Sequence, residues 1–410
     1  MPPAAPTSAF ARVAHIAADR RVHAAFQWLH LQQPQILRWQ AEVVSIPAPT
    51  FEERARAERL CDLFRDTGLS DVGIDEIGNV VGVCRAAQPA EDAVLVSAHL
   101  DTVFPATVAI EPTLEGTRLE APGACDNGAG LACLLALAAA LQQAALAPEC
   151  DIYFVANVGE EGEGNLRGIR HIYHRAPWKD RITAHLVIDG AGHEIAVTDA
   201  LGSQRFLVRI TGPGGHSWTD ASRPNPIVVL SQAIARITAL ELPTSPRTTL
   251  NIGTIEGGTS VNTIPESASI RIDTRSTAPE QLIRLEVEIH RAFEDVVFAA
   301  NQPQIHRARK HAPLTLAIEK IGNRPAGQLR QDSALYDNLL AVDRHLGIRT
   351  ETRTASTDAN IPLALGVPAV TLGGGGDGGG IHTRAEWYDA HGREIGLRRV
   401  LLLLLAMSGI

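Results

Sequence analysis

The chain has 410 residues, more than one hydrophobic core usually organises, so two domains are expected. The net charge of −9 and the lack of a basic run argue against a nucleic-acid partner or an anionic membrane surface. No apolar run approaches the ~18 residues of a membrane span, and the first residues do not read as a secretory signal. We therefore expect a soluble, cytoplasmic protein that neither binds nucleic acid nor spans a membrane.

Helical patterns and short apolar runs alternate through the first half of the chain. Residues 8–46 predict helix with a break near 33–34, and 51–67 predict a second helix capped by Thr50. The stretch 73–86 predicts a hairpin. Apolar runs at 94–100, 152–158 and 186–188 are typical of buried strands, and helices are predicted between them at 128–143 and 166–174. This alternation predicts an α/β fold with a mixed, largely parallel sheet flanked by helices.

The pattern changes after residue 202. Strands are predicted at 204–210, 248–255 and 268–273, helices at 225–240 and 279–299, and a last strand at 304–310. This order predicts a small antiparallel sheet with helices on one face, inserted as a domain at 204–315. The α/β pattern then resumes with a helix at 333–346, a strand at 368–372 and a helix at 393–407. The first domain is therefore predicted to comprise 1–203 and 316–410.

The five cysteines indicate neither a disulfide framework nor a thiolate metal site, because their number is odd and none forms a C-x-x-C pair. Cys125 stands beside Asp126, which makes it a candidate nucleophile. No residue is placed to activate it, so we interpret it as a packed side chain.

Four imidazole or carboxylate residues lie at or just after the carboxyl ends of predicted strands. They are His99, Glu160, Glu161 and Asp189. Ligands of parallel sheets bind beyond the carboxyl ends of the strands, so these side chains are expected to meet there. Asp101 lies two residues after His99, on the same side of an extended chain. It is placed to hold the second ring nitrogen of that imidazole.

Two more candidates lie in glycine-rich loops. Asp126 precedes a predicted helix, and His382 follows the loop 373–380, which contains seven glycines. Taken singly, Asp126 fits a helix cap, His382 fits the end of a flexible linker, and Glu160–Glu161 fits a solvated acidic turn. Together the candidates supply two imidazoles, three carboxylates and one spare glutamate. That set suits two zinc-like ions that share a carboxylate and a water, with the spare glutamate as general base.

Nine short motifs occur in order along the chain: HLDTV (99–103), GACDNGAG (123–130), VANVGEEGEGNLRG (155–168), VIDG (187–190), GGHS (214–217), NTIP (262–265), IDTR (272–275), STDAN (356–360) and GGGGDGGGIHT (373–383). They resemble the dinuclear zinc metallopeptidase family that includes peptidase T, dipeptidases, glutamate carboxypeptidase, acetylornithine deacetylase, succinyl-diaminopimelate desuccinylase and the aminoacylases. The resemblance runs from about residue 45 to the C-terminus and is closest to the tripeptidase-like branch. The N-terminal forty or so residues lie outside it.

The resemblance implies a zinc-exopeptidase-like fold and a role for each candidate ligand. His99 and Asp189 would bind one divalent metal, Glu161 and His382 the other, and Asp126 would bridge them. Zinc is expected, and cobalt and manganese also suit these ligands. The peptide bond after Asp126 is expected to be cis.

The resemblance also implies roles for residues around the metals. Glu160 would be the general base, and Asp101 would orient a metal-bound imidazole. The inserted domain would be a ferredoxin-like lid that joins two copies into a homodimer. From that lid His216 would reach the partner's active site and polarise the scissile carbonyl, while Asn262 and Arg275 would bind substrate, with Arg275 suited to a carboxylate.

The resulting hypothesis is a hydrolase of small peptides. A hydroxide bridging two metals would attack the amide carbonyl, with Glu160 as the base. One alternative is an N-acyl amino acid deacylase with the same mechanism. The other is a non-catalytic binding relative, which we rank low because every ligand position is filled.

Overall fold

The computed structural model describes residues 8–302 and 312–410. The chain forms two compact units, one within Met1–Ala200 and Gln328–Ile410, the other within Leu201–Gly327. The second unit ends at Gly327 rather than at the expected 315, because β14 (Thr315–Arg324) pairs with β9 (Gly202–Thr211) of the same unit. The strand predicted at 304–310 lies outside the described residues.

The first unit is built on a mixed sheet, nine-stranded within the described residues. Its centre is parallel, because β3 pairs in parallel with β6 and β7, and β7 pairs in parallel with β17. In spatial order the strands are β1 (Ser70–Ile74), β2 (Val80–Cys84), β6 (Asp151–Asn157), β3 (Ala93–His99), β7 (Ile182–Ile188), β17 (Ala369–Leu372), β8 (Ile195–Ala200) and β15 (Gly327–Gln328), with β16 (Glu351–Ala355) on β8. The largely parallel sheet predicted from the sequence is confirmed.

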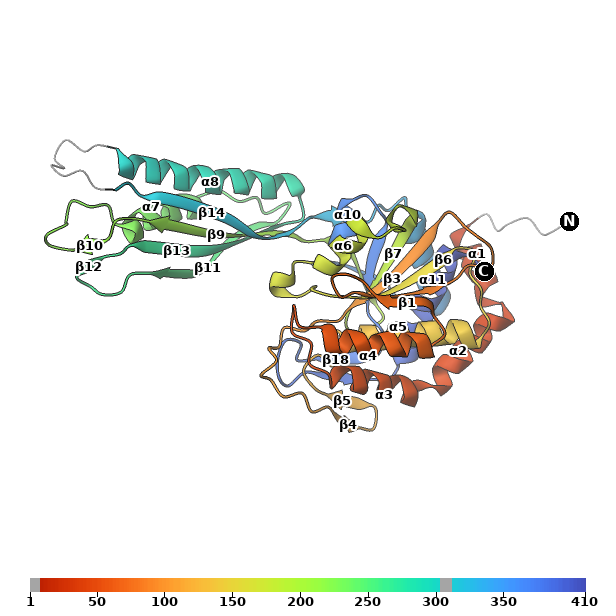
Figure 1. Ribbon diagram of the computed structural model, residues 1–410. Helices are drawn as coiled ribbons and strands as arrows, with labels where there is room; N and C mark the ends of the chain where they lie inside the picture. Colours follow the sequence, from red (N-terminus) through yellow and green to blue (C-terminus); the bar gives the residue numbers. More distant parts are fainter. Residues whose placement is uncertain (1–7, 303–311) are drawn as a thin grey trace. The chain divides into compact units, whose positions relative to one another are not determined.

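Helices cover both faces of this sheet (Figure 1). They are α1 (Ala9–Ala17), α2 (Arg20–Leu31), α3 (Gln33–Val44), α4 (Arg54–Asp66), α5 (Gly128–Gln143), α6 (Arg167–Arg175), α9 (Ala334–Leu346), α10 (Asn360–Ala364) and α11 (Arg393–Ser408). The break expected near 33–34 is confirmed, because α2 ends at Leu31 and α3 begins at Gln33 with Pro34 in its first turn. A second break, between α1 and α2, was not predicted, and Asp19 caps α2 there.

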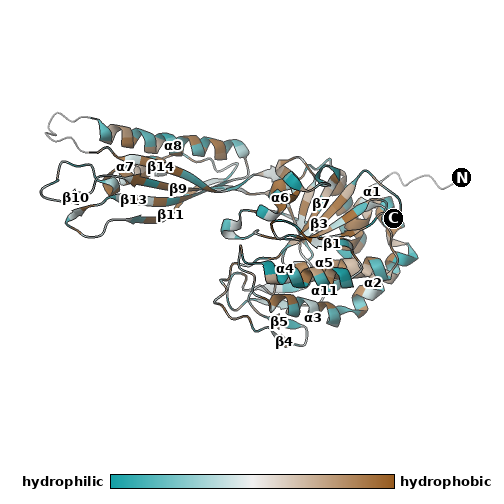
Figure 2. Ribbon diagram, viewed as in Figure 1, coloured by the Kyte–Doolittle hydropathy of each residue, from teal (hydrophilic) through white to brown (hydrophobic). Residues whose placement is uncertain are grey.

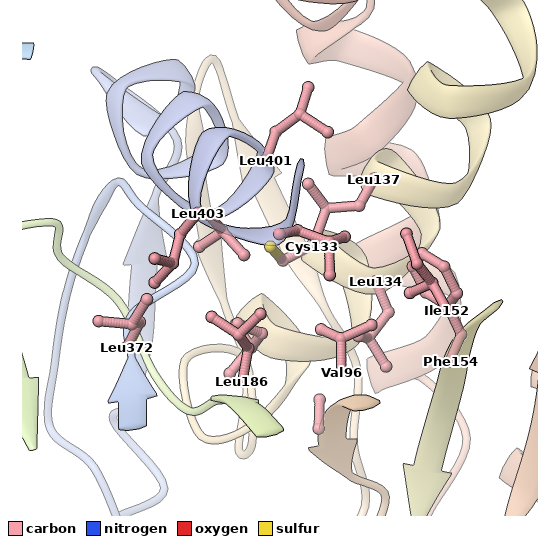
Figure 3. Close-up of a cluster of buried hydrophobic side chains, with 14 of the residues drawn as sticks. Val96, Cys133, Leu134, Leu137, Ile152, Phe154, Leu186, Leu372, Leu401 and Leu403 are labelled. Atoms are coloured by element: carbon pink, nitrogen blue, oxygen red, sulfur yellow. The ribbon is translucent and has the colours of Figure 1, made fainter. Parts of the chain in front are cut away.

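The main core lies between the sheet and α5 with α11. Figure 3 shows Leu134 and Leu137 of α5 and Leu401 and Leu403 of α11 over the strand residues Val96, Ile152, Phe154, Leu186 and Leu372. Helix α5 is buried along almost its whole length, which explains why its sequence is apolar on every side. The hydropathy colouring of Figure 2 shows the same contrast between apolar central strands and mixed outer helices.

Close packing at the start of α5 sets the position of the loop before it. A Cβ atom on Gly130 would lie 2.6 Å from the Ile188 carbonyl oxygen, so only glycine lets the helix approach the end of β7 this closely. Asn127 caps α5 and also donates to the Ile188 carbonyl at 2.8 Å. The loop that carries Asp126 is thereby fixed beside the strand that precedes Asp189.

The second unit is an antiparallel sheet with two helices on one face (Figure 1). Its strands run in the order β11 (Thr248–Gly257), β13 (Ser267–Ser276), β9 and β14. Helices α7 (Pro226–Thr238) and α8 (Pro279–Asn301) pack their apolar sides on β9 and β13. The short strands β10 (Gly215–His216) and β12 (Thr263–Ile264) form a separate ribbon. The expected α+β unit is present.

A small antiparallel sheet in the first unit was not predicted. It comprises β18 (Asp377–Gly379), β19 (Trp387–Asp389), β5 (Arg118–Glu120) and β4 (Thr113–Glu115). Its strands are three residues long, too short for a sequence period to appear. In this sheet the end of the glycine-rich loop, β18, pairs with β19, and His382 lies in the segment that connects the two strands.

Candidate metal centre

The first donor group gathers at the end of β3. Nε2 of His99 lies 3.0 Å from Asp126 Oδ1 and 3.7 Å from Asp189 Oδ1. His99 is the last residue of β3, and Asp189 directly follows β7, the parallel neighbour of β3. The candidate ligand atoms of these three residues all lie within 4.8 Å of one another.

The second donor group shares Asp126 with the first. Nε2 of His382 lies 3.0 Å from Asp126 Oδ2 and 3.0 Å from Glu161 Oε1. His382 has a φ of 63°, in the left-handed region that non-glycine residues rarely adopt. Such a conformation is kept where surrounding structure requires it, commonly at functional sites. Asp126 therefore directs one carboxylate oxygen to each imidazole, and the peptide bond from Asp126 to Asn127 is cis.

Glu160 lies at the edge of both groups. Its carboxylate forms a third overlapping set of neighbouring donors with His99 and Glu161. Glu160 and Glu161 are both buried, which excludes the simpler interpretation of a solvated acidic turn. The loop after β6 thus brings two adjacent carboxylates to the same centre.

Asp101 acts differently from the sequence prediction. The Nδ1 of His99 contacts the backbone carbonyl of Asp101 at 3.0 Å, whereas the nearest carboxylate oxygen, Oδ1, is 3.7 Å away. The carboxylate instead accepts hydrogen bonds from the backbone N–H groups of Glu160 and Glu161, both at 2.9 Å. The strand ends at His99, so the alternation that predicted a shared side does not extend to Asp101.

Thr50 completes the surroundings of Asp101. Its hydroxyl donates to Asp101 Oδ2 at 2.9 Å. The predicted cap is wrong, because α4 begins only at Arg54 and has Glu53 at its N-cap position. Thr50 therefore supports the loop that carries Glu160 and Glu161, through Asp101.

Glu386 is a buried residue of the site that sequence reasoning missed. Its carboxylate accepts backbone hydrogen bonds from Gly123 at 2.9 Å and from Cys125 and Asp126 at 2.8 Å each. It lies four residues after His382, so one segment supplies a candidate ligand and also fixes the loop of another. The signal in the sequence was a glutamate four residues after a candidate ligand. Such a pair is too common in sequences to identify a functional residue.

Opposite charges determine the protonation of the centre. Burial alone would lower the pKa of His99, but the nearby carboxylates of Asp101, Asp126 and Asp189 outweigh burial and hold this pKa well above its usual value. The hydrogen bond to Asp126 raises the pKa of His382 to about 9. Burial opposes ionisation of Asp126, yet the close imidazolium groups of His382 and His99 hold its pKa well below the usual range. Burial raises the pKa of Glu161.

The residues present fit a pair of divalent cations. The donors are imidazole nitrogens and carboxylate oxygens, which suit zinc and similar metals. Asp126 Oδ1 is buried and forms no hydrogen bond of acceptable geometry with the part of the chain that the structure describes. An oxygen in that condition is suited to a cation. Protons on the two imidazoles balance the carboxylates in the absence of metal.

The three other predicted site residues belong to the second unit. His216 on β10 is exposed and lies near Asn262, whose backbone carbonyl accepts from Ser217 at 3.0 Å. Arg275 lies at the far end of β13, where its Nε donates to Asp273 Oδ2 at 2.8 Å. Within this unit the structure therefore groups His216 with Asn262 and separates both from Arg275.

Residues 95–406 match the family described as Peptidase family M20/M25/M40. The chain belongs to this family, and we conclude that it is a hydrolase. The resemblance predicted from the motifs is thereby confirmed. Within the described residues, no helix has both the length and the apolar character needed to cross a bilayer.

Relatives in sequence and structure cover nearly the whole chain. It is 26% identical over 354 residues to a succinyl-diaminopimelate desuccinylase of Corynebacterium glutamicum, covering 84% of this chain and 89% of that protein. Its structure resembles the aminopeptidase PepT of Bacillus cereus, with a TM-score of 0.73, 21% identity and coverage of 91% and 98% of the two chains. It also resembles the Bacillus subtilis YXEP protein, described as a dinuclear metal-binding peptidase, with a TM-score of 0.67, 14% identity and coverage of 92% and 99%.

Proposed function

We propose that the protein hydrolyses an amide bond of small peptides at a centre that holds two divalent metals. The observation that carries the proposal is the position of Asp126, which belongs to both donor groups. His99 and Asp189 would hold one metal with Asp126, and Glu161 and His382 would hold the other. Zinc is the metal we expect, with cobalt or manganese as alternatives.

Two such cations, when bound, would lower the pKa of a water between them and polarise a substrate carbonyl. Glu160 would accept the proton of the attacking water and pass it to the leaving amine. Its burial and its closeness to both His99 and Glu161 support that role. The hydrogen bond from the backbone N–H of Glu160 to the Asp101 carboxylate would keep Glu160 in place during the proton transfer.

The unit Leu201–Gly327 would act as a lid that joins two copies of the chain. Strand β11 is an edge strand, and its residues after Gly253 are exposed, so it offers unpaired backbone groups to a second copy. We propose that His216 assists the partner's active site by donating to the developing oxyanion, and that Asn262 and Arg275 bind substrate.

The second candidate function is deacylation of an N-acyl amino acid. The relative from Corynebacterium glutamicum favours it, because a desuccinylase cleaves an N-acyl amide. The likeness to the aminopeptidase PepT of Bacillus cereus favours a peptide substrate, and this likeness is one of fold only. Both reactions need the same centre and differ in whether an amine or an acyl group anchors the substrate.

Metal analysis and a substrate panel test the proposal. We expect about two equivalents of metal per chain after reconstitution with zinc, cobalt or manganese. Di- and tripeptides should be hydrolysed faster than N-acetyl and N-succinyl amino acids. The reverse order would establish the deacylase, and a protein that binds no metal and cleaves neither class would overturn both.

A further inference from the structure

Asn157 and Asp358 form a buried polar pair in the first unit. Asn157 ends β6, and Asp358 stands two residues before α10. The Nδ2 of Asn157 donates to Asp358 Oδ2 at 2.7 Å, and both residues have an exposed fraction of 0%. Neither residue belongs to the donor groups described above.

One side-chain oxygen of each residue lacks a hydrogen bond. Asn157 Oδ1 and Asp358 Oδ1 are both buried, and neither has a partner among residues 8–302 and 312–410. An amide oxygen and an ionised carboxylate oxygen can only accept. A proton on Asp358 Oδ1 changes this, because a carboxylic acid and a primary amide can exchange two parallel hydrogen bonds. The two unpaired oxygens belong to residues already joined by the first of those bonds.

The surroundings disfavour a charge on Asp358. Within the described chain no arginine or lysine forms an ion pair with it, unlike Asp343, whose buried carboxylate is bound by both ends of the Arg399 guanidinium at 2.7 Å. The pKa of Asp358 is raised to about 7, mainly by burial and also by the charges of Asp101 and Asp189. His99 and the hydrogen bond from Asn157 act in the opposite direction and limit this increase.

The backbone of Asn157 is part of the frame of the site. Its carbonyl accepts from the Leu100 N–H at 2.7 Å, and it faces His99 across the β3–β6 pair. Glu160 follows three residues later. On the other side, the Thr357 hydroxyl next to Asp358 is bonded to the Thr371 hydroxyl of β17 at 2.7 Å. The pair thus links the end of β6 to a loop held by β17.

We propose that Asp358 is a neutral carboxylic acid whose Oδ1 hydroxyl donates to Asn157 Oδ1, and that this closed pair is a positioning element for the metal centre. It fixes the ends of β3 and β6, from which His99, Glu160 and Glu161 extend. Its effect on catalysis rests on the proposed function, but the pair itself is a property of the metal-free fold.

The variants Asp358→Asn and Asp358→Ala test the proposal. Asparagine can form the same two hydrogen bonds, since its amide donates to Asn157 Oδ1 and its carbonyl accepts from Asn157 Nδ2. Asp358→Asn should keep the melting temperature and the zinc affinity of the wild type. Asp358→Ala leaves Asn157 unpaired, so we expect zinc affinity about 10- to 100-fold weaker and a lower melting temperature.

A matched control is Asp343→Asn, because that aspartate is buried to the same degree but bound to a guanidinium. It should lower the melting temperature, since an uncompensated arginine stays buried. If Asp358→Asn is as damaging as Asp358→Ala, the carboxylate acts as an anion and the proposal is wrong. If Asp358→Ala behaves as wild type, the positioning role is wrong.

Infrared spectroscopy of the metal-free protein gives a readout that requires no substrate. The wild type at mildly acidic to neutral pH should show the carbonyl stretch of a protonated carboxylic acid that is missing from the Asp358→Asn protein. Absence of that difference would overturn the neutral pair. A protein that shows the band but hydrolyses nothing would leave the pair standing while refuting the proposed function.

Discussion

Glu386 and Asp126 are joined by a hydrogen bond of 2.8 Å from the backbone N–H of Asp126 to Glu386 Oε1. The same carboxylate receives the N–H groups of Gly123 and Cys125. The carboxylate proposed to bridge two metals is therefore carried by a loop that a second, buried carboxylate holds in place.

We expect Glu386→Gln to weaken metal binding. A glutamine has one acceptor oxygen, so its NH₂ group must face a backbone N–H, and at least one of the bonds is lost. Loss of such a support typically reduces metal affinity about 10- to 100-fold. Isothermal titration of the chelator-treated protein with zinc would measure it. Glu394→Gln changes a partly exposed glutamate of the same C-terminal segment that is paired with His30, and it should leave the affinity unaltered. Equal affinities for both variants would contradict the support role.

Replacing Glu160 should separate metal binding from turnover. Because Glu160 is not assigned to either metal, Glu160→Ala should keep about two metals per chain while turnover falls about 10²- to 10⁴-fold. Elemental analysis and steady-state kinetics on the same sample would check both parts. Turnover near that of the wild type, or loss of metal together with activity, would remove Glu160 from the role of base.

The stability of the metal-free protein should depend on the charge of His382. Its pKa is raised to about 9 in the fold, from an ordinary value of 6.5. The imidazolium contacts with Asp126 and Glu161 therefore stabilise the fold fully below about pH 6.5, and this contribution is lost as pH rises through about 9. The effect should be modest because the side chain is half exposed and screened by solvent.

The affinity for zinc should depend on pH in the opposite direction. Metals bind the neutral imidazole, so binding should release protons and become tighter as pH rises over the same interval. Thermal unfolding with and without zinc between about pH 6 and pH 9 would reveal both trends. In the metal-free His382→Gln protein, the part of the pH dependence of stability that comes from this residue should disappear. An unchanged pH dependence would mean that other groups, such as His99, cause it.

Mixing two inactive variants would test the proposed lid. His216→Ala lacks the assisting imidazole and Glu160→Ala lacks the base, so each homodimer should be nearly inactive. In a mixed dimer the site with an intact Glu160 would receive His216 from the other copy. Random exchange should restore about a quarter of wild-type activity, because half of the dimers are mixed and each has one complete site. No recovery after verified exchange would show that His216 does not act across the dimer.

Local sequence signals predicted much of the fold because they depend on neighbouring residues. The apolar runs before His99, Glu160 and Asp189 predicted the strands that precede them, and the carboxyl ends of parallel strands must meet at one edge. The helix at 128–143 was predicted at its observed bounds because its composition is uniform. The region 8–46 was less well predicted, since only two residues separate its first two helices: Ala18, the C-cap of α1, and Asp19, the N-cap of α2.

The sequence by itself determined which side chains could form the centre, because their residue types and their places after strands and glycine-rich loops can be recognised locally. Only the tertiary structure decided how they are held. Hydrogen bonds join residues that are far apart in the sequence: Glu386 and Asp126 are 260 residues apart, Asp101 and Glu161 are 60 apart, and Asn157 and Asp358 are 201 apart. Such partners leave no period in the sequence, since the packing of whole elements brings them together.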